Sequence, residues 1–531
     1  MSGGRTLLSY EDIPERFNLA TYFVDRHLEE GRGSRVALYV DDRKHTYAEV
    51  ARATNRIGNV LQALEVRADE RVLLALSDGL DFVAAWYGTL KIGAVVAETY
   101  TFLQPKDYAY YLNYTRAGVV IVDETTRAKV AAIADECPHL RYRVVAGEVS
   151  PAGLAPGEVA LAEISQAVAD ELDAADTSKD DIALWKFTTG STGAPKAAVH
   201  CHHDPLISFA SYAKAVIGYC ESDIVMPVPK LFFGYARDAT VLFTFGVGAA
   251  GVIFPERSTP DVLFELIRRH RPTILVQVPT MMNAMANSRD AEEQDLSSIR
   301  LVISSGEALP VEVHERWLRT FGVEVLEGIG SSEAYHIYIS NRPGEARPGS
   351  VGKVVPGYRA RIVGPDGTEA AAGEEGELWV SGESTGLLYW ADHQRTKRTF
   401  FGDDIRTGDV FVRDTDGYFW YRGRADELLK VGGIFVAPLE IEACLREHPD
   451  VSDCAVVGYE ASGLQLPRAY VVASGDPSAE LADLLKQFVR ARLSPHKYPR
   501  DVQFVDELPK TPSGKINRRA LSPPPATDRA R

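Results

Sequence analysis

Short runs of β-branched residues alternate with longer amphipathic stretches between about residues 35 and 330. RVLLAL, GVVIV and GVIF are each followed by apolar residues at helical spacing, and TILVQV and LVISSG continue the series. Such runs predict buried strands, and the spacing after them predicts helices. Regular alternation of the two is typical of parallel sheets covered by helices. The sequence therefore predicts an α/β fold with a large N-terminal domain of helix-covered β-sheets.

The pattern changes after Gly349. RARIV, GELWVSG, FVRD and GYFWYRGR are short alternating segments separated by DG and GD turns, which predict a small antiparallel, β-barrel-like unit. From Asp426 onward two helical and two strand patterns predict a smaller α+β domain, and the Pro-rich end LSPPPATDRAR predicts disorder. We therefore predict an N-terminal domain over 1–425, a C-terminal domain over 426–520 and a disordered tail over 521–531.

Composition narrows the classes of function. The chain has 531 residues, of which 45% are hydrophobic and 25% charged, and these values are ordinary for a soluble protein of several domains. Its formal net charge of −16 opposes general attraction to nucleic acid or anionic lipid. We therefore predict no nucleic-acid and no membrane partner, and any anionic ligand must be bound by local groups.

Cysteine usage and the N-terminus predict the compartment. The five cysteines are widely spaced and form no CxxC pair, so neither a disulfide framework nor a zinc ribbon is indicated. MSGGRTLLSYEDIPERF carries acidic residues where a signal peptide needs an apolar stretch. The longest uncharged run, Ala239 to Pro255, is broken by glycines and predicts a buried helix, turn and strand rather than a membrane span. A cytoplasmic location is expected.

The strongest local signal is TTGSTGAPK, which directly follows the apolar run IALWKF. Its glycines let backbone N–H groups converge on an anion, its hydroxyls add donors and Lys196 adds a positive charge. It is not the Walker pattern, because Gly190 and Lys196 are spaced differently and Ala197 replaces the Ser/Thr. The alternative, a polar loop between strands, explains this composition less well. The residues of the predicted polyphosphate site are Thr188, Thr189, Gly190, Ser191, Thr192, Gly193 and Lys196.

TTGSTGAPK resembles the phosphate loop of the acyl-adenylate-forming superfamily, which includes acyl-CoA synthetases, peptide-synthetase adenylation domains and luciferases. The resemblance continues in order through SSGEALP, GIGSSE, RTGD, YRGRADELLKVGG and PKTPSGKINR. Within the superfamily, KLFFGY, SSEAYHIYISN and KVVPGY are most similar to benzoate-CoA ligases and related aryl-CoA ligases. The resemblance implies an acid–thiol ligase that uses ATP and Mg²⁺ to form an acyl-adenylate and then transfers the acyl group to coenzyme A.

The resemblance assigns catalytic roles to three residues. A carboxylate and ATP are both anions, so their reaction needs cations in place. Lys515 is implied to bridge the acyl carboxylate and the α-phosphate, Lys196 to bind phosphate and Glu333 to hold Mg²⁺. Taken alone, the lysine of PSGK could be a surface residue and the GD of RTGD simply a turn. The remaining implied nucleotide-binding residues are Gly306, Glu307, Ala308, Gly328, Ile329, Gly330, Ser331, Ser332, Asp409 and Arg424, the last two at the ribose.

The resemblance also implies a conformational change. Asp426 matches the hinge about which the C-terminal domain turns between adenylation and thioester formation. The turn would bring Lys430, Gly432 and Gly433 to the site, where the glycines leave room for the pantetheine arm. Lys and Arg outnumber Asp and Glu over residues 486–519, so CoA phosphates could bind there, although a solvated basic face explains the excess equally well.

An aromatic group of residues is implied to bind the acid. Phe233, Gly234 and Tyr235 match the aryl-binding helix of benzoate-CoA ligases, and His336 and Ile337 match residues that line the ring site. A small glycine beside aromatic walls would admit a planar ring. Simple core packing of the phenylalanines remains an open alternative.

Two departures from the aryl-ligase pattern bear on the acid. Arg237 and Asp238 stand where Leu-Gly is usual, and Ala334 and Tyr335 follow the glutamate where Met-Leu is common. A charged pair near the pocket could contact a hydroxyl or amino substituent, or close one wall and open another. We therefore count Arg237 among the substrate residues and predict a substituted aryl acid rather than plain benzoate.

Several alternatives stay open. The acyl group could pass to an acyl carrier protein or a separate transferase instead of CoA, the acid could be a bulky non-aryl one, and the protein could form a homodimer. A degenerate relative that only binds nucleotide is disfavoured because Lys196, Glu333, Asp409 and Lys515 occur together. The close histidines of HCHH suggest a metal cluster, but successive strand residues alternate faces and cannot readily share one ion.

Overall fold

The computed structural model describes residues 7–189, 195–425, 429–431, 434–461, 464–493, 497–510 and 516–521. The chain divides into two compact units, one formed by Met1–Ala360 with Val380–Arg406 and the other by Arg361–Trp379 with Thr407–Arg531. This division crosses strands of the small sheet, whereas the boundary expected from the sequence lies at residue 426. The predicted domain limits therefore stay predictions, and each unit is described separately.

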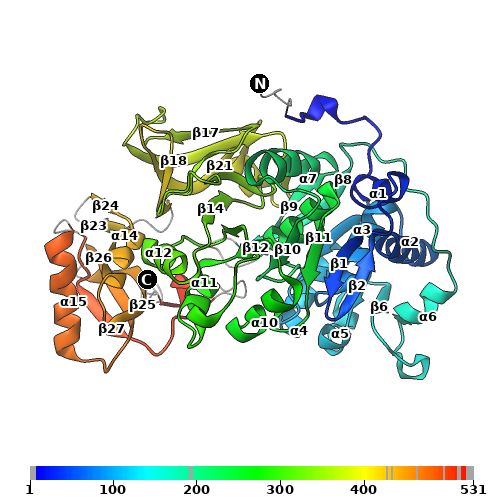
Figure 1. The fold of residues 1–531 in the computed structure, drawn as a ribbon, viewed down its shortest axis with the longest axis horizontal. Helices are drawn as coiled ribbons and strands as arrows, with labels where there is room; N and C mark the ends of the chain where they lie inside the picture. Colours follow the sequence, from blue (N-terminus) through cyan, green and yellow to red (C-terminus); the bar gives the residue numbers. More distant parts are fainter. Residues whose placement is uncertain are drawn as a thin grey trace, which may run out of the picture. The chain divides into compact units, whose positions relative to one another are not determined.

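An eight-stranded sheet of the first unit carries the strands on either side of the predicted phosphate loop (Figure 1). Its order is β19-β9-β8-β4-β3-β5-β6-β7. Neighbours from β8 to β7 are parallel, while β9 runs antiparallel to both β8 and β19. The strands are β3 (Arg71–Ala75), β4 (Val95–Glu98), β5 (Val119–Val122), β6 (Tyr142–Val145), β7 (Glu158–Ala160), β8 (Ile182–Thr189), β9 (Pro195–Cys201) and β19 (Leu388–Tyr389).

A nine-stranded sheet of the same unit has the order β16-β15-β14-β13-β12-β10-β11-β1-β2. Its six central strands, from β14 to β1, are parallel, and antiparallel strands flank them. The strands are β1 (Val36–Val40), β2 (Arg43–Thr46), β10 (Ile224–Pro227), β11 (Ala250–Ile253), β12 (Ile274–Gln277), β13 (Leu301–Ser304), β14 (Val325–Gly330), β15 (Ile337–Ser340) and β16 (Lys353–Val354).

Helices follow these strands as the hydrophobic pattern predicts. Helix α10 shows why: Pro260 starts it, the Thr259 hydroxyl accepts from the Val262 amide, and its apolar face is buried. The helices of the first unit are α1 (Arg26–Glu29), α2 (Tyr47–Ala63), α3 (Leu80–Lys91), α4 (Pro105–Thr115), α5 (Glu124–Ala131), α6 (Leu161–Gln166), α7 (His203–Ser208), α8 (Gly234–Arg237), α9 (Phe243–Val247), α10 (Pro260–His270), α11 (Pro279–Ala286), α12 (Val311–Phe321) and α13 (His393–Thr399).

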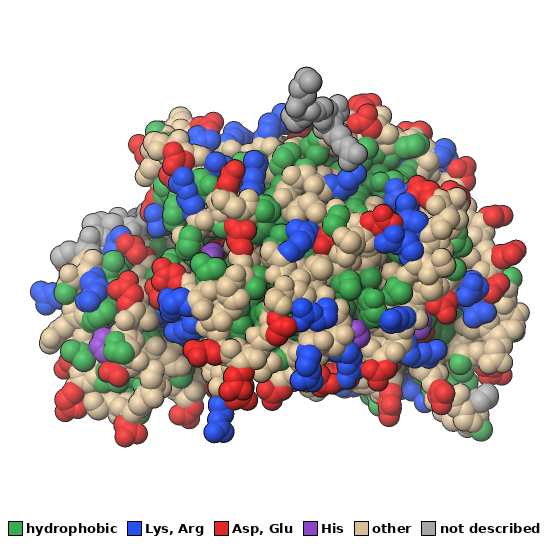
Figure 2. Space-filling model, in the orientation of Figure 1, with side chains coloured by type: hydrophobic (Ala, Val, Ile, Leu, Met, Phe, Trp, Pro, Cys, Tyr) green, Lys and Arg blue, Asp and Glu red, His purple; other side chains and the backbone are tan. Residues whose placement is uncertain are grey.

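The long uncharged run is buried, as predicted. It forms the π-helical turn η6 (Asp238–Leu242), helix α9 and strand β11, all within the core. Among the described residues, no helix is both long enough and apolar enough to cross a membrane. Acidic and basic side chains are interspersed on the face drawn in Figure 2.

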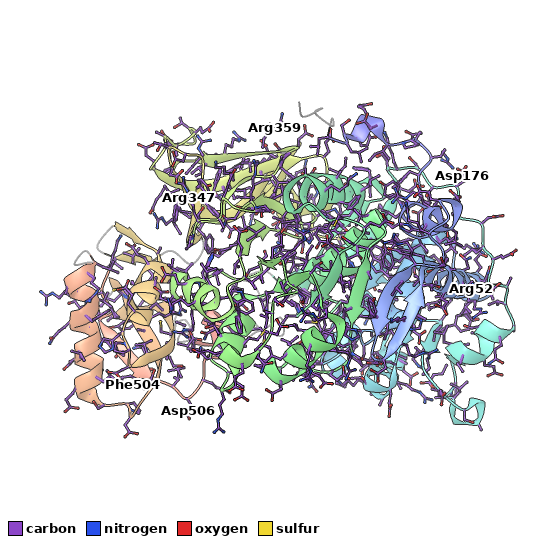
Figure 3. All side chains as sticks on the ribbon, viewed as in Figure 1. Arg52, Asp176, Arg347, Arg359, Phe504 and Asp506 are labelled. Atoms are coloured by element: carbon purple, nitrogen blue, oxygen red, sulfur yellow. The ribbon has the colours of Figure 1, made fainter. Side chains whose placement is uncertain are left out.

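The smaller elements confirm the predicted change of pattern. A further sheet has the order β17-β18-β21-β20, with β22 paired to β21, and β21 is antiparallel to both β20 and β22. Phe504, labelled in Figure 3, packs against the apolar core of the C-terminal elements. The strands and helices are β17 (Tyr358–Val363), β18 (Glu375–Gly382), β20 (Phe400–Phe401), β21 (Asp404–Arg413), β22 (Phe419–Arg424), β23 (Leu429–Val431), β24 (Ile434–Val436), α14 (Pro438–Arg446), β25 (Val451–Ala461), β26 (Leu464–Ala473), α15 (Ala479–Arg492), β27 (Asp501–Phe504) and α16 (Arg518–Leu521).

Candidate active site

The predicted phosphate loop joins two paired strands. Thr188 of β8 lies opposite Lys196 of β9, and Thr189 lies opposite Pro195, so the ends of the loop are held next to each other. Strand pairing therefore fixes where the loop leaves and re-enters the sheet. The loop residues Gly190, Ser191, Thr192 and Gly193 lie outside the described residues.

Lys196 and Glu333 are brought together, and a tyrosine joins them. The Lys196 Nζ lies 3.4 Å from Glu333 Oε1 and donates to the Tyr389 hydroxyl at 2.5 Å. The Tyr389 hydroxyl in turn donates to Glu333 Oε1. Burial alone would raise the pKa of Glu333, but the Lys196 ammonium and the Tyr389 hydroxyl lower it below its ordinary value. Glu333 is therefore an ionised, partly accessible carboxylate beside a cation.

This cluster fits a magnesium ion. Mg²⁺ prefers oxygen ligands and is usually bound by one or two carboxylates together with substrate phosphates. Glu333 supplies such a carboxylate next to the phosphate-loop strands. The described residues contain no group of three His, Cys, Asp or Glu side chains that could hold a metal without a substrate.

The histidines of the HCHH segment contact protein groups, and His200 and His203 share Asp204 as a partner. The His200 ring lies 2.6 Å from the Ser332 carbonyl oxygen through Nε2 and 2.6 Å from Asp204 through Nδ1. His202 Nδ1 accepts from the Leu19 amide. His200 therefore ties the backbone next to Glu333 to helix α7.

Of the implied nucleotide-binding residues, Gly328, Ile329 and Gly330 lie on β14, and Gly306, Glu307 and Ala308 lie in the loop after β13. A Cβ at Gly330 would lie 2.3 Å from the His336 carbonyl oxygen, so only glycine fits there. Glu307 accepts from the Thr280 hydroxyl at 2.6 Å, which fixes the loop that also contains Gly306 and Ala308. Gly328 and Ile329 are paired with β15, and Ile337 of that strand is buried.

The aromatic residues predicted at the acyl site are close together. The rings of Phe233 and Tyr235 are 6.4 Å apart, and the rings of Tyr235 and His336 are 5.5 Å apart. A Cβ at Gly306 would lie 3.8 Å from the Phe233 ring, so an implied nucleotide-binding residue adjoins an implied acyl-site residue. Burial lowers the pKa of His336 to about 3, and its imidazole is therefore neutral at physiological pH.

Arg237 and Asp238 belong to a buried charge cluster. Asp238 accepts from the Lys186 ammonium and from the Arg237 guanidinium, and Arg237 also binds Glu98. The Tyr335 hydroxyl donates to Asp238 at 2.9 Å. Both departures from the aryl-ligase pattern therefore meet in one network. Contact of Arg237 with a substrate substituent stays a prediction.

The second unit contains the predicted ribose-binding pair. Asp409 and Arg424 lie opposite each other on β21 and β22, and Arg424 Nη1 is 3.2 Å from Asp409 Oδ1. Arg424 also donates to the Thr407 carbonyl oxygen at 2.8 Å. Sheet pairing thus places the two side chains within reach of each other.

Some predicted residues cannot be placed. Lys515, Asp426, Gly432, Gly433 and the side chain of Lys430 lie outside the described residues, so their roles stay predictions. Three residues of the two clusters were missed by the sequence analysis: Tyr389, Lys186 and Glu98. Lys186 did leave a signal, because it interrupts the apolar run IALWKF and a lysine is rarely buried without a partner.

Comparisons with known proteins identify the family. A model described as AMP-binding enzyme matches residues 24–390, and one described as AMP-binding enzyme C-terminal domain matches residues 440–515. The chain is 40% identical to a benzoate–CoA ligase of Thauera aromatica over 512 residues, covering 95% of this chain and 96% of that protein. It is 38% identical to a 4-hydroxybenzoate–CoA/benzoate–CoA ligase of Rhodopseudomonas palustris over 514 residues, covering 95% and 94%.

A solved structure agrees with these matches. The crystal structure of the anthranilate CoA ligase AuaEII in complex with anthranoyl-AMP superposes with a TM-score of 0.92 at 36% identity, covering 97% of this chain and 98% of that one. The resemblance predicted from the motifs is therefore confirmed over nearly the whole chain. The chain belongs to the AMP-binding enzyme family.

Proposed function

We propose that the protein is an ATP- and Mg²⁺-dependent aryl acid–CoA ligase. The acid's carboxylate attacks the α-phosphorus of ATP to give an acyl-adenylate and pyrophosphate. The CoA thiol then attacks the acyl carbon, which yields the thioester and AMP. The observation that supports this most directly is the Lys196–Tyr389–Glu333 cluster at the phosphate-loop strands, in the same unit as an aromatic acyl site.

Each residue of the site has a physical role in the adenylation step. Lys196 and the loop amides bind the phosphates, while Asp409 accepts hydrogen bonds from both ribose hydroxyls. Glu333 holds Mg²⁺, which neutralises phosphate charge when it is bound. Lys515 supplies the second cation, placed between the carboxylate and the α-phosphate.

The acid is proposed to be a substituted benzoate. The relatives named above act, by their names, on benzoate, 4-hydroxybenzoate or anthranilate, so one aromatic ring with a carboxylate is common to all. Phe233, Tyr235 and the neutral ring of His336 provide aromatic surface for such a ring.

The thiol step is proposed to use the C-terminal segment. Rotation at Asp426 would replace Lys515 by Lys430, Gly432 and Gly433, and the basic segment 486–519 would bind the CoA phosphates. Transfer to a carrier protein instead of CoA and formation of a homodimer remain predictions.

The test is pyrophosphate exchange with a panel of aryl, alkyl and polycyclic acids, followed by product analysis with and without CoA. We expect exchange with substituted benzoates and thioester only when CoA is present. Exchange with no thioester would favour a carrier protein as acceptor, and no exchange with any acid would contradict the proposal.

Lys515→Ala separates the two half-reactions. We expect this variant to lose acid-dependent pyrophosphate exchange and to retain thioester formation from supplied acyl-AMP, because the lysine serves only the first step. Equal loss of both activities would contradict the role assigned to Lys515.

A further inference from the structure

Four charged side chains are buried together beneath the acyl site. Lys186 and Glu98 are 5% exposed, and Arg237 and Asp238 are fully buried. They come from three separate elements, since Glu98 ends β4, Lys186 lies in β8, and Arg237 and Asp238 lie at the junction of α8 and η6. Two cations and two carboxylates balance the charge of the cluster.

The cluster is tightly connected. Lys186 Nζ donates to Asp238 Oδ2 at 2.6 Å, and Arg237 donates to Asp238 Oδ1 through Nε at 3.0 Å and Nη2 at 2.8 Å. Arg237 Nη1 donates to Glu98. Burial would raise the pKa of Asp238, but the charges of Arg237 and Lys186 lower it to about 2. Asp238 is therefore ionised and shared between two cations.

The cluster also holds a strained residue. Tyr335 has a φ of +72°, in the left-handed region that bulky residues rarely adopt. Lys186 Nζ donates to the Tyr335 carbonyl oxygen at 2.5 Å and lies 3.9 Å from the centre of its ring, while the Tyr335 hydroxyl donates to Asp238. Both ends of the residue are thus held by the same ion pair.

Tyr335 connects two parts of the proposed site. It directly precedes His336 at the acyl site and lies two residues after Glu333. Lys186 also reaches the other side of the acyl site, because a Cβ at Gly234 would lie 2.6 Å from its Cε. One lysine side chain therefore contacts both α8 and the turn that carries His336.

We propose that Lys186 is a positioning residue of the acyl site, which holds Tyr335 and Asp238 together and so fixes His336 relative to Gly234. This inference rests on the proposed function and deepens it. Buried ion pairs seldom add net stability relative to apolar packing, but they can select one arrangement of the chain. The cluster thus limits which aryl acids fit, by fixing the shape of the acyl site rather than by touching the ring.

The arrangement gives Arg237 a different role from substituent contact. Its guanidinium is fully buried and binds carboxylates through Nε, Nη1 and Nη2. Its guanidinium lies over the Trp86 ring, with Cζ 4.8 Å from the ring centre. Within this proposal Arg237 orients Asp238 for Lys186.

The test compares Lys186→Met/Asp238→Asn with a matched control, Lys91→Met/Asp25→Asn. Each double variant removes one cation and one anion, so charge balance is kept. Lys91 is also buried, and its Nζ lies 2.8 Å from Asp25. We expect the first variant to raise the KM of the preferred aryl acid about ten-fold or more and to leave the KM of ATP within about two-fold. The control should leave both unchanged.

The profile across an acid panel gives a second readout, because a loosened site should accept bulkier acids relatively better. Unchanged acid KM and unchanged acid preference in Lys186→Met/Asp238→Asn would overturn the proposal, and so would equal changes in the control. Equal rises of the acid and ATP KM values would also overturn it.

A milder variant covers the case in which the double variant does not fold. Tyr335→Phe removes only the hydroxyl that donates to Asp238, and we expect it to raise the acid KM about three-fold. An unchanged acid KM would then overturn the proposal. If the wild-type protein itself shows no acid-dependent pyrophosphate exchange, the proposed function fails before any variant is compared.

Discussion

Two lysine–carboxylate clusters have their lysines on one hairpin, formed by β8 and β9, and differ in exposure. Lys196 and Glu333 have side chains that are 16% and 13% exposed, and the distance between their charged atoms is 3.4 Å. Lys186 and Asp238 are 5% and 0% exposed, and their charged atoms are 2.6 Å apart. The first pair keeps enough exposure for a ligand to contact Lys196 or Glu333. Among the described residues, the charges of the second pair contact only protein groups in its cluster.

The register of the hairpin explains the difference. Lys186 lies opposite Ala198 in the interior of the sheet, whereas Lys196 lies opposite Thr188 next to the loop. A charge inside the sheet must be neutralised by protein groups, because leaving it unpaired is costly. A lysine charge at the loop can be neutralised by a phosphate group. The same residue type is therefore closed within the structure at Lys186 and is proposed to bind ligand at Lys196 on the paired strand.

Removal of a carboxylate from the closed cluster should have the largest effect. Asp238→Ala leaves Lys186 and Arg237 buried without their shared partner, and we expect a loss of about 3–5 kcal/mol in the free energy of unfolding. Urea unfolding of the variant and of wild type measures this. A loss below about 1 kcal/mol would show that water or Glu98 neutralises the charges left by Asp238. The cluster would then not depend on Asp238 as the shared partner.

The open cluster should respond in activity rather than stability. Glu333→Gln removes the charge that is proposed to hold Mg²⁺, and we expect pyrophosphate exchange to fall about 10²–10³-fold. The midpoint of urea unfolding should fall less than in Asp238→Ala, because the Glu333 side chain keeps 13% exposure and the Gln amide can still hydrogen-bond to Tyr389 and Lys196. A large loss of stability with retained pyrophosphate exchange would show that Glu333 serves the fold rather than the reaction, and would contradict the distinction between the two clusters.

Tyr389→Phe should weaken the open cluster without removing a charge. The hydroxyl orients Glu333 and accepts from Lys196, and loss of such a supporting hydrogen bond typically weakens metal binding about 10–100-fold. Titration with Mn²⁺ in the presence of a non-hydrolysable ATP analogue, followed by electron paramagnetic resonance, measures binding directly. Tyr47→Phe is the control, since that buried hydroxyl donates to Ala249 in the core. Equal binding by Tyr389→Phe and wild type would contradict the role.

The sequence predicted the contiguous features and missed those that depend on distant pairing. Strand–helix alternation and the motif around Lys196 follow from local periodicity and spacing, so they were predictable. Tyr389 reaches Glu333 because the two-residue strand β19 pairs with β9, and so short a strand has no periodic signal. The charge of Lys186 was visible, but its partner Asp238 comes from another element, and so does Glu98, which pairs with Arg237.

Glu327, a buried carboxyl, can be compared with Asp238, a buried carboxyl paired with two cations, in the pH dependence of stability. Glu327 is 4% exposed and accepts a hydrogen bond from the Leu309 amide, and no ion pair to it is found among the described residues. Burial raises its pKa to about 8, whereas Asp238 has a pKa of about 2. Between pH 6 and 7 the folded protein therefore keeps a proton on Glu327 that the unfolded chain has released, and Asp238 is ionised in both states.

The two carboxyls consequently predict opposite pH behaviour. The contribution of Glu327 to the free energy of unfolding is fully present below about pH 4.5 and is lost as pH rises through about 8. Between pH 6 and 7 the free energy of unfolding should therefore fall by about 1.4 kcal/mol per pH unit because of this group. That of Asp238 is present above about pH 4 and lost as pH falls through about 2. Glu327→Gln should therefore reduce the slope of unfolding free energy against pH in this window, and Asp238→Asn should leave it unchanged. If the free energy of unfolding of wild type and of Glu327→Gln had the same slope against pH, Glu327 would be ionised in the folded state. Burial without a neighbouring cation would then not explain a difference in pKa between Glu327 and Asp238.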